Sequence, residues 1–218
     1  MKKIIALSLL TGLVATAAHA IKADTSTRIG EGTYVAAITG YSDNHLKFNK
    51  ELVPGSGITK ATLGSLDLAV AGGYMGVWKE VLLGIEVVGG YATGTKTYDD
   101  GIGKNTIDLT RGFFCEGVGK IGLRVDRAGY YVLGGFTRSN FRVQTTNKST
   151  GKVLKAGIFH QGPFAGVGAM YNLIDRISVG AEFRHVVFNR HSLRVVLPGL
   201  SVRIRSNVYT ARLIYHLQ

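Results

Sequence analysis

The last twelve residues of the chain alternate between apolar and polar side chains. Successive side chains of a β-strand point to opposite faces. One parity of this segment holds Tyr209, Ala211, Leu213, Tyr215 and Leu217. The other parity carries Arg212 and His216. A final strand that is apolar on one face and charged on the other is typical of a barrel with its apolar face in a lipid bilayer.

The start of the chain is typical of an exported protein. Two lysines precede an apolar run over residues 4–18, and the tripeptide Ala-His-Ala at 18–20 supplies the small residues that signal peptidase requires. A transmembrane anchor, the alternative, needs about 20 apolar residues, and this run is shorter. We expect residues 1–20 to be a cleaved signal peptide of the Sec pathway and residues 21–218 to form one barrel domain.

Composition favours β-structure. The chain has 30 glycines and only 3 prolines, and no apolar run after the signal peptide is long enough for a membrane helix. Cys115 is the single cysteine, so no intramolecular disulfide can form. The formal net charge of +12 falls to +10 when Lys2 and Lys3 are removed with the signal peptide.

Period-2 patterning predicts eight strands, the smallest number in bacterial outer-membrane barrels. The expected segments are 32–42, 65–79, 81–97, 105–125, 129–146, 153–172, 177–190 and 201–217. Their connections alternate in length, because short turns near 79–80, 126–128 and 173–176 separate longer polar loops. This predicts an eight-stranded antiparallel transmembrane up-and-down β-barrel of the all-β class, with short turns and both termini in the periplasm.

Charged residues recur on the minority face of these segments. They form the expected lumen network: Glu86, Glu116, Lys120, Glu182, Arg184 and Arg212. Apolar residues, including Ile107, Leu109 and Phe113, take the opposite parity and are expected to face lipid. An Arg or Lys at the lipid midplane costs about 2–4 kcal/mol, so the parity indicates that these charges face the lumen. A water-soluble eight-stranded barrel would instead bury these charges in an apolar interior.

Parity leaves some positions open. Either face of segments 32–42 and 129–146 could point inward. Arg111 and His185 take the lipid parity, and we expect both near the outer rim, where they could reach lipid headgroups. Phe114, Phe164 and Met170 share the inward parity. The lumen charges can then be interpreted as a plug of mutual ion pairs or as the lining of a narrow, porin-like ion path.

A family resemblance rests on residues 166–185. They read Gly-Val-Gly-Ala-Met-Tyr-Asn-Leu-Ile-Asp-Arg-Ile-Ser-Val-Gly-Ala-Glu-Phe-Arg-His. This stretch resembles the sixth strand, turn and seventh strand of OmpA-like and opacity-type surface proteins of Gram-negative bacteria, which read Gly-x-Gly-x-x-Tyr, a short turn with Asp, and Gly-x-Glu-Tyr-Arg-Tyr. The resemblance implies a narrow outer-membrane barrel with variable surface loops and no periplasmic peptidoglycan-binding domain.

The resemblance also implies recognition by the outer-membrane assembly machinery, which reads a terminal aromatic residue in this family. The chain departs from the family here, because it ends in Leu217-Gln218. Tyr215 is the aromatic side chain that could substitute.

Positive charge is concentrated toward two of the expected surface loops. No acidic residue lies between Asp126 and Asp175, and none follows Glu182. The candidate polyanion-binding residues of this basic rim are Arg138, Arg142, Lys148, Lys152, Lys155, Arg190, Arg194, Arg203 and Arg205. Such a rim attracts polyanions. We expect this rim to bind lipopolysaccharide or an anionic host surface, as in an adhesin or surface antigen. The barrel wall is expected to contact the outer-membrane lipid.

Other functions find little support in the sequence. The loops lack the aromatic residues that would stack nucleobases, so no specific nucleic acid is expected. His191-Ser192 is the one adjacent His-Ser pair, and adjacent strand residues face opposite sides, which argues against a lipid A-modifying enzyme. We expect a non-enzymatic protein without metal ligands or cofactors.

Overall fold

The computed structural model describes most of the chain outside its N-terminal region. The described residues are 32–51, 57–99, 105–151, 153–189, 191–192 and 201–217. The predicted signal peptide and its cleavage site lie outside them. No described helix is long and apolar enough to cross a membrane.

The described chain is built of antiparallel strands, which confirms the predicted fold class. The strands are β1 (Gly32–Phe48), β2 (Lys60–Trp78), β3 (Val81–Asp99), β4 (Asn105–Val125), β5 (Ala128–Asn147), β6 (Val153–Ile174), β7 (Ile177–Val187), β8 (His191–Ser192) and β9 (Ser201–Leu217). Eight of them form the barrel wall, and the two-residue β8 pairs with the outer end of β9.

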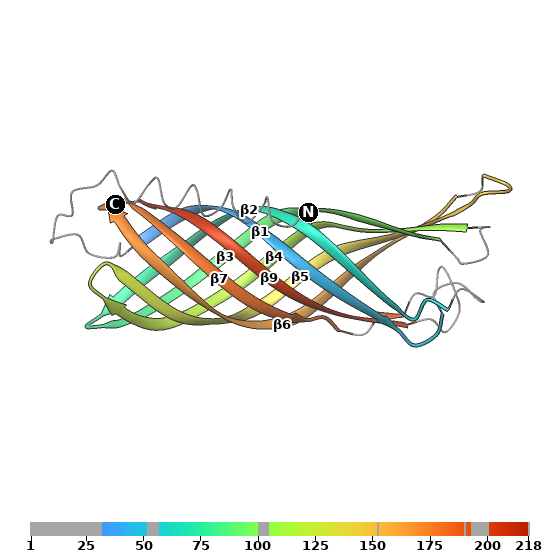
Figure 1. Cartoon of the computed structure of the whole chain (residues 1–218). Coiled ribbons are helices and arrows are strands. Elements are labelled where there is room, and N and C mark those ends of the chain that lie inside the picture. Colours follow the sequence, from blue (N-terminus) through green and yellow to red (C-terminus); the bar gives the residue numbers. More distant parts are fainter. Residues whose placement is uncertain are drawn as a thin grey trace, which may run out of the picture.

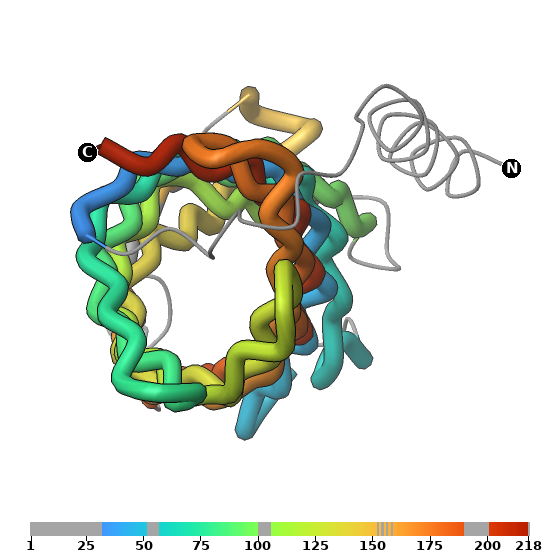
Figure 2. Tube along the Cα trace, turned by 90° about the vertical axis from the view of Figure 1, so that its left-hand side faces the viewer, coloured from blue at the N-terminus to red at the C-terminus, as the bar shows by residue number. Residues whose placement is uncertain are grey.

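Each wall strand pairs with the next wall strand along the chain, with β7 paired to β9, and the sheet closes on itself (Figure 1). β1 pairs with β9 along its whole length, from Thr33 opposite Leu217 to Phe48 opposite Val202. Seen along the axis, the backbone forms a ring (Figure 2). Buried side chains fill its interior. The architecture that the resemblance to OmpA-like proteins implies, an eight-stranded antiparallel up-and-down barrel, is therefore confirmed.

The two ends of the barrel differ in their connections. Tight turns join the strands at one end, and two of them place Lys79 and Asp126 at positive φ angles of 59° and 51°. At the other end the strands run further than predicted. Residues 43–48 and 60–64 belong to β1 and β2, although the sequence suggested a long loop over 43–64. Inward Leu46, Phe48, Ala61 and Leu63 are apolar and alternate with polar outward residues such as Lys47 and Lys60, while inward Asn44 is polar. The sequence prediction placed this stretch outside both strands.

An apolar belt surrounds the half of the barrel that is nearer the tight turns. Its exposed residues include Leu66, Leu68, Val70, Leu83, Ile85, Val87, Ile121, Val132, Val167 and Leu213. Exposed aromatics border the belt toward the tight turns, at Tyr74, Trp78, Tyr130, Tyr171 and Tyr215, and toward the other end, at Tyr41, Tyr91, Phe113 and Tyr209. About 9–11 residues of a tilted strand cross a bilayer. The wall strands have 11 to 22 residues, so most of them extend beyond the belt at the end away from the tight turns, called the outer end below.

The lumen is filled in layers. Phe114, Phe164 and Met170 point inward and are buried, as their parity predicted. The two open segments are settled as well. Tyr34 in β1 and Tyr131 in β5 face the lumen, while Tyr130 faces outward. Toward the outer end the interior becomes apolar, lined by Leu46, Phe48, Leu63, Ile107, Leu109, Phe141, Val143, Phe188, Val202 and Ile204.

Four positions in β4 depart from the predicted parity. Arg111 pairs with Phe141 and Phe114 pairs with Ser139, so Gly112 and Phe113 together lie opposite one residue of β5. This β-bulge inserts one residue and exchanges the two faces of the strand. Ile107 and Leu109, predicted to face lipid, are therefore buried inside, and Arg111 is only 2% exposed.

The prediction that Arg111 reaches headgroups at the rim is wrong for this reason. Asp108 has the same sequence parity as Glu116 and Lys120, but the bulge places it on the outer side, where its carboxylate accepts a hydrogen bond from Thr97 at 2.6 Å. His185 does face outward, as predicted. Its Nδ1 lies 2.8 Å from Oδ1 of Asn207 on the neighbouring β9.

Candidate functional site: a charged lumen and a basic outer end

The six residues of the expected lumen network lie together inside the barrel. They come from β3, β4, β7 and β9, which contribute Glu86, Glu116 with Lys120, Glu182 with Arg184, and Arg212. Lys120 Nζ donates to Glu86 at 3.2 Å and to Glu182 at 2.9 Å. These three side chains and Arg212 have no exposed area, so each charge depends on its partners rather than on water.

Glu182 is the acceptor that most of the network shares. It receives hydrogen bonds from Lys120, Arg184, Arg212 and the hydroxyl of Tyr131, the last at 2.9 Å. Glu116, in contrast, pairs with Arg184 alone among the network cations. The network therefore has a centre at Glu182 and a periphery at Glu116.

Tyrosine hydroxyls and glycines complete this layer. Tyr34 donates to Glu86 at 2.7 Å. A Cβ added at Gly73 would lie 2.7 Å from the Tyr34 hydroxyl, and one at Gly168 would lie 2.6 Å from the Tyr131 ring. Both glycines are therefore needed for the tyrosines to fit beside the carboxylates.

A second charged layer, which sequence analysis did not identify, lies nearer the outer end. Arg111 Nη1 is 3.1 Å from Asp67, and it also donates to Ser42 at 2.7 Å. Its Nε donates to Ser139 at 3.1 Å, and its guanidinium lies 5.1 Å from the Phe114 ring centroid. No period-2 pattern could place Arg111 here, since the bulge reverses its face.

The charges of the two layers cancel. Four acidic residues, Asp67, Glu86, Glu116 and Glu182, stand against four basic ones, Arg111, Lys120, Arg184 and Arg212. The formal net charge of +12 therefore belongs to residues outside these layers. Positive charge available to a ligand must lie elsewhere in the molecule.

The two ends of the barrel carry very different charge. Each tight turn holds one basic and one acidic residue, in the pairs Lys79-Glu80, Asp126-Arg127 and Asp175-Arg176. The outer ends of the wall strands instead carry exposed cations at Lys47, Lys60, Lys96, Arg138, Arg142, Lys155, Arg203 and Arg205. The structure thus places the unbalanced charge on the outer surface beyond the apolar belt.

The predicted rim residues divide into two groups and a remainder. Arg138, Arg142 and Lys155 are exposed on β5 and β6, and Arg203 and Arg205 are exposed on β9. The Arg138 guanidinium lies 4.7 Å from the ring centroid of Phe159.

The remaining rim residues contribute less or cannot be placed. Lys148 pairs with Asp99 at 2.7 Å, so its charge is partly neutralised. Lys152, Arg190 and Arg194 lie outside the described residues.

Three further basic residues join the β9 group, and sequence analysis missed them. Lys47 and His45 on β1 and Lys60 on β2 line a groove on the outer face together with Arg203 and Arg205. The groove has a volume of about 330 Å³. The missing signal was the strand extension, because residues 43–48 and 60–64 were interpreted as loop.

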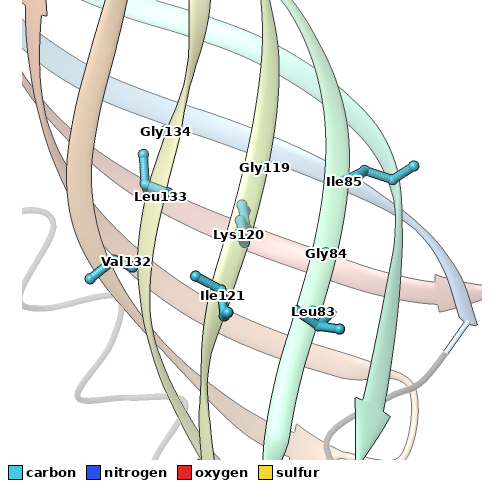
Figure 3. Close-up of a pocket in the computed structure, with 9 residues that line it drawn as sticks. All are labelled: Leu83, Gly84, Ile85, Gly119, Lys120, Ile121, Val132, Leu133 and Gly134. Carbon is cyan, nitrogen blue, oxygen red and sulfur yellow. The ribbon is translucent and has the colours of Figure 1, made fainter.

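A larger hollow of about 530 Å³ lies on the lipid-facing side of β3, β4 and β5 (Figure 3). Its floor is open because Gly119 and Gly134 carry no side chain, and Leu83, Ile85 and Val132 border it. Lys120 also borders the hollow, but its ammonium group is paired with Glu86 in the lumen. This hollow belongs to the apolar belt and offers no polar group for chemistry.

The described residues hold no group of three His, Cys, Asp or Glu side chains that could bind a metal ion. The His191-Ser192 pair forms the backbone of β8, with His191 opposite Val202 and Ser192 opposite Ser201.

Comparisons with known proteins concern the fold. No protein-family model and no curated protein matches this chain. Among solved structures, Ail, the attachment invasion locus protein of Yersinia pestis, is 13% identical over 85% of this chain and 99% of its own, with a TM-score of 0.44. Neisserial surface protein A is 12% identical over 86% of this chain and 99% of its own, with a TM-score of 0.48. Outer membrane protein AlkL, solved in DMPC bilayers, is 15% identical over 90% and 96%, with a TM-score of 0.42.

Proposed function

We propose that this chain is a non-enzymatic surface protein of the Gram-negative outer membrane whose basic outer end binds anionic glycans. The ligand is the lipopolysaccharide of its own membrane or, in an adhesin-like role, a polyanion on a host surface. The barrel anchors the chain, and the exposed cations beyond the apolar belt provide the binding surface.

The observation that carries this proposal is the difference in charge between the two ends. The turns at the periplasmic end are balanced and the lumen layers are neutral, whereas exposed Lys and Arg accumulate at the outer end. A cluster of exposed cations raises the local concentration of polyanions and releases their counterions on binding. Binding of this kind weakens steeply as salt increases.

The alternative of a narrow channel is less well supported. An eight-stranded barrel is only wide enough for its own side chains. Here Lys120, Glu182 and Arg212 meet across the lumen without exposed area. An ion would have to displace these contacts, and we propose that the layer acts as a plug.

The alternative of a lipid A-modifying enzyme is also less well supported. A nucleophilic serine needs a histidine within hydrogen-bonding reach. His191 and Ser192 are adjacent residues of β8. Ser178 Oγ does lie 2.9 Å from His216 Nε2, but both residues are fully buried, and no carboxylate among the described residues bonds to His216 Nδ1. Mass spectrometry of lipid A from cells with and without the gene tests this, and we expect identical spectra.

Salt-dependent retention tests the proposed binding. Native protein in detergent micelles is passed over immobilised lipopolysaccharide and, separately, over heparin. A variant with Arg142, Lys155, Arg203 and Arg205 changed to glutamine should elute at much lower salt on at least one of them. A matched variant with Lys79, Arg124, Arg127 and Arg176 changed to glutamine loses the same charge at the periplasmic end and should elute like the native protein. Equal retention of all three proteins would contradict the proposal.

A further inference from the structure

Three cations lie side by side in one row across β9, β1 and β2. Lys47 is directly opposite Arg203 on one side and directly opposite Lys60 on the other. Directly opposite residues of antiparallel strands have Cβ atoms about 4.5–5.5 Å apart, and like charges at this distance repel. His45 and Arg205 form a second row, two residues nearer the membrane.

Backbone contacts fix this arrangement at the end of the strands. Asn49 N donates to Ser201 O at 3.1 Å, and Ser201 N donates to the Asn49 side chain at 2.6 Å. Phe48 N donates to Thr59 O at 2.9 Å. The inward residues between the cations, Leu46, Ala61 and Ile204, are packed in the lumen. The three strands therefore hold their register up to the row, and the cations cannot separate by moving the backbone.

The groove that these cations line has no acid among its described lining residues. The closest acidic side chain along β1, Asp43, pairs with His45 at 3.4 Å. Arg203, Lys47 and Lys60 thus lack a carboxylate partner within the groove. A dianionic group would relieve their mutual repulsion and could accept hydrogen bonds from all three.

The height of the groove indicates which anion it meets. Tyr41 and Tyr209 lie opposite each other and mark the outer edge of the apolar belt. Lys47 is six residues beyond Tyr41, which is about 14 Å along the membrane normal for a strand tilted by about 45°. This level lies above the hydrocarbon, among the sugars of the surrounding glycolipid.

We propose that this groove is a specific site for a phosphate group carried on the saccharide of lipopolysaccharide, held by Arg203, Lys47 and Lys60. The inference rests on the proposed function and assigns one site to it. Arg205 and His45 lie toward the membrane, where they face the sugar that bears the phosphate. The cations of β5 and β6 then add attraction that does not depend on a particular group.

The test compares two variants with equal loss of charge. Lys47→Gln/Arg203→Gln removes two cations of the row, and Arg142→Gln/Lys155→Gln removes two exposed cations from the other group. Calorimetric titration in micelles uses purified lipopolysaccharide, the same material after removal of its phosphates, and inorganic phosphate. We expect the first variant to lose about tenfold or more in affinity for intact lipopolysaccharide and the second about threefold or less. Dephosphorylated material should bind all three proteins equally weakly.

Three outcomes would overturn the inference. Equal losses in the two variants would show that total charge, and not the row, determines binding, while the proposed function would stand. Inorganic phosphate that binds as tightly as lipopolysaccharide would show a site without a saccharide. Native protein that binds neither lipopolysaccharide nor heparin at low salt would overturn the proposed function as well. Far-ultraviolet circular dichroism of both variants establishes that the barrel is intact.

Discussion

Arg111 and Asp67 form a buried ion pair, with 3.1 Å between Nη1 and Oδ2, although simple alternation along β4 would put Arg111 in contact with lipid. The β-bulge at Gly112 and Phe113 makes the pair possible, because the inserted residue exchanges the inward and outward faces of β4 toward its outer end. It also supplies Ile107 and Leu109 to the interior. One inserted residue thus determines that the side chains of Ile107, Leu109 and Arg111 face the lumen.

A labelling experiment tests the bulge directly. Leu109 and Cys115 have the same parity in the sequence, but Cys115 is exposed and Leu109 is buried inside. A fluorophore on native Cys115 should be quenched by brominated acyl chains in reconstituted vesicles. The thiol of Leu109→Cys, made in a Cys115→Ser background, lies beyond the belt and should react slowly with a water-soluble maleimide, because position 109 is buried inside the barrel. Rapid labelling of the folded Leu109→Cys variant would mean that the strand has no bulge.

Breaking the Arg111–Asp67 pair should destabilise the barrel. Asp67→Asn leaves the guanidinium buried without its counter-charge, and losing one partner of a buried pair costs about 3–5 kcal/mol. Urea unfolding in lipid vesicles, followed by tryptophan fluorescence, measures the change. The double variant Arg111→Met/Asp67→Leu removes both charges and should recover most of the loss. A single variant as stable as the native barrel would show that the pair is not needed.

Parity predicted the belt region of the fold well because two energetic requirements apply there. Outward side chains such as Val70 and Ile85 must be apolar, and a lumen charge such as Glu86 needs partners from other strands. Alternation therefore places Glu86, Lys120 and Arg212 in the lumen without any knowledge of distances. Their pairing follows from the closure of the barrel, which the closing strand indicated.

The strand ends beyond the apolar belt were harder to predict because neither requirement applies there. Lys47 and Lys60 alternate with apolar residues, but no lipid requires it, and the intervening polar loop hides the pattern. The cationic row depends on the register between β1, β2 and β9. Lys47 and Arg203 are far apart in the sequence, and only closure brings them together. The bulge at Gly112 is similarly invisible, since no residue type requires it there.

The centre and periphery of the lumen network should differ in their effect on stability. Glu182 accepts hydrogen bonds from Lys120, Tyr131 and two arginines. Glu182→Gln therefore leaves several buried donors without a negatively charged acceptor. We expect a loss of about 3–5 kcal/mol. Glu116→Gln affects Arg184 alone and should cost less than half as much. The same urea titration compares them, and a larger loss for Glu116→Gln would contradict the assignment of Glu182 as the centre.

Planar-bilayer recording tests the plug. Native protein should give no steady conductance, because Lys120, Glu182 and Arg212 occupy the lumen without exposed area. Glu182→Ala/Arg212→Ala removes one charge of each sign and leaves space for water, so small current steps should appear. A steady current through the native barrel would instead favour the channel. If neither protein gave a current, the apolar outer layer, with Phe141 and Phe188, would also close the lumen.

The row of Arg203, Lys47 and Lys60 should lower the free energy of unfolding of the barrel when no anion is bound. Lys47 faces Arg203 and Lys60, and cross-strand pairs contribute about 0.2–1 kcal/mol each, with the unfavourable sign for like charges. Lys47→Gln should therefore raise the free energy of unfolding in low salt, in vesicles of zwitterionic lipid. The gain should shrink in high salt, where surface repulsion is screened. Arg142→Gln is the control on β5 and should change stability little. If Lys47→Gln lowered stability, the three side chains would not repel one another, and the driving force for filling the groove with a phosphate would be absent.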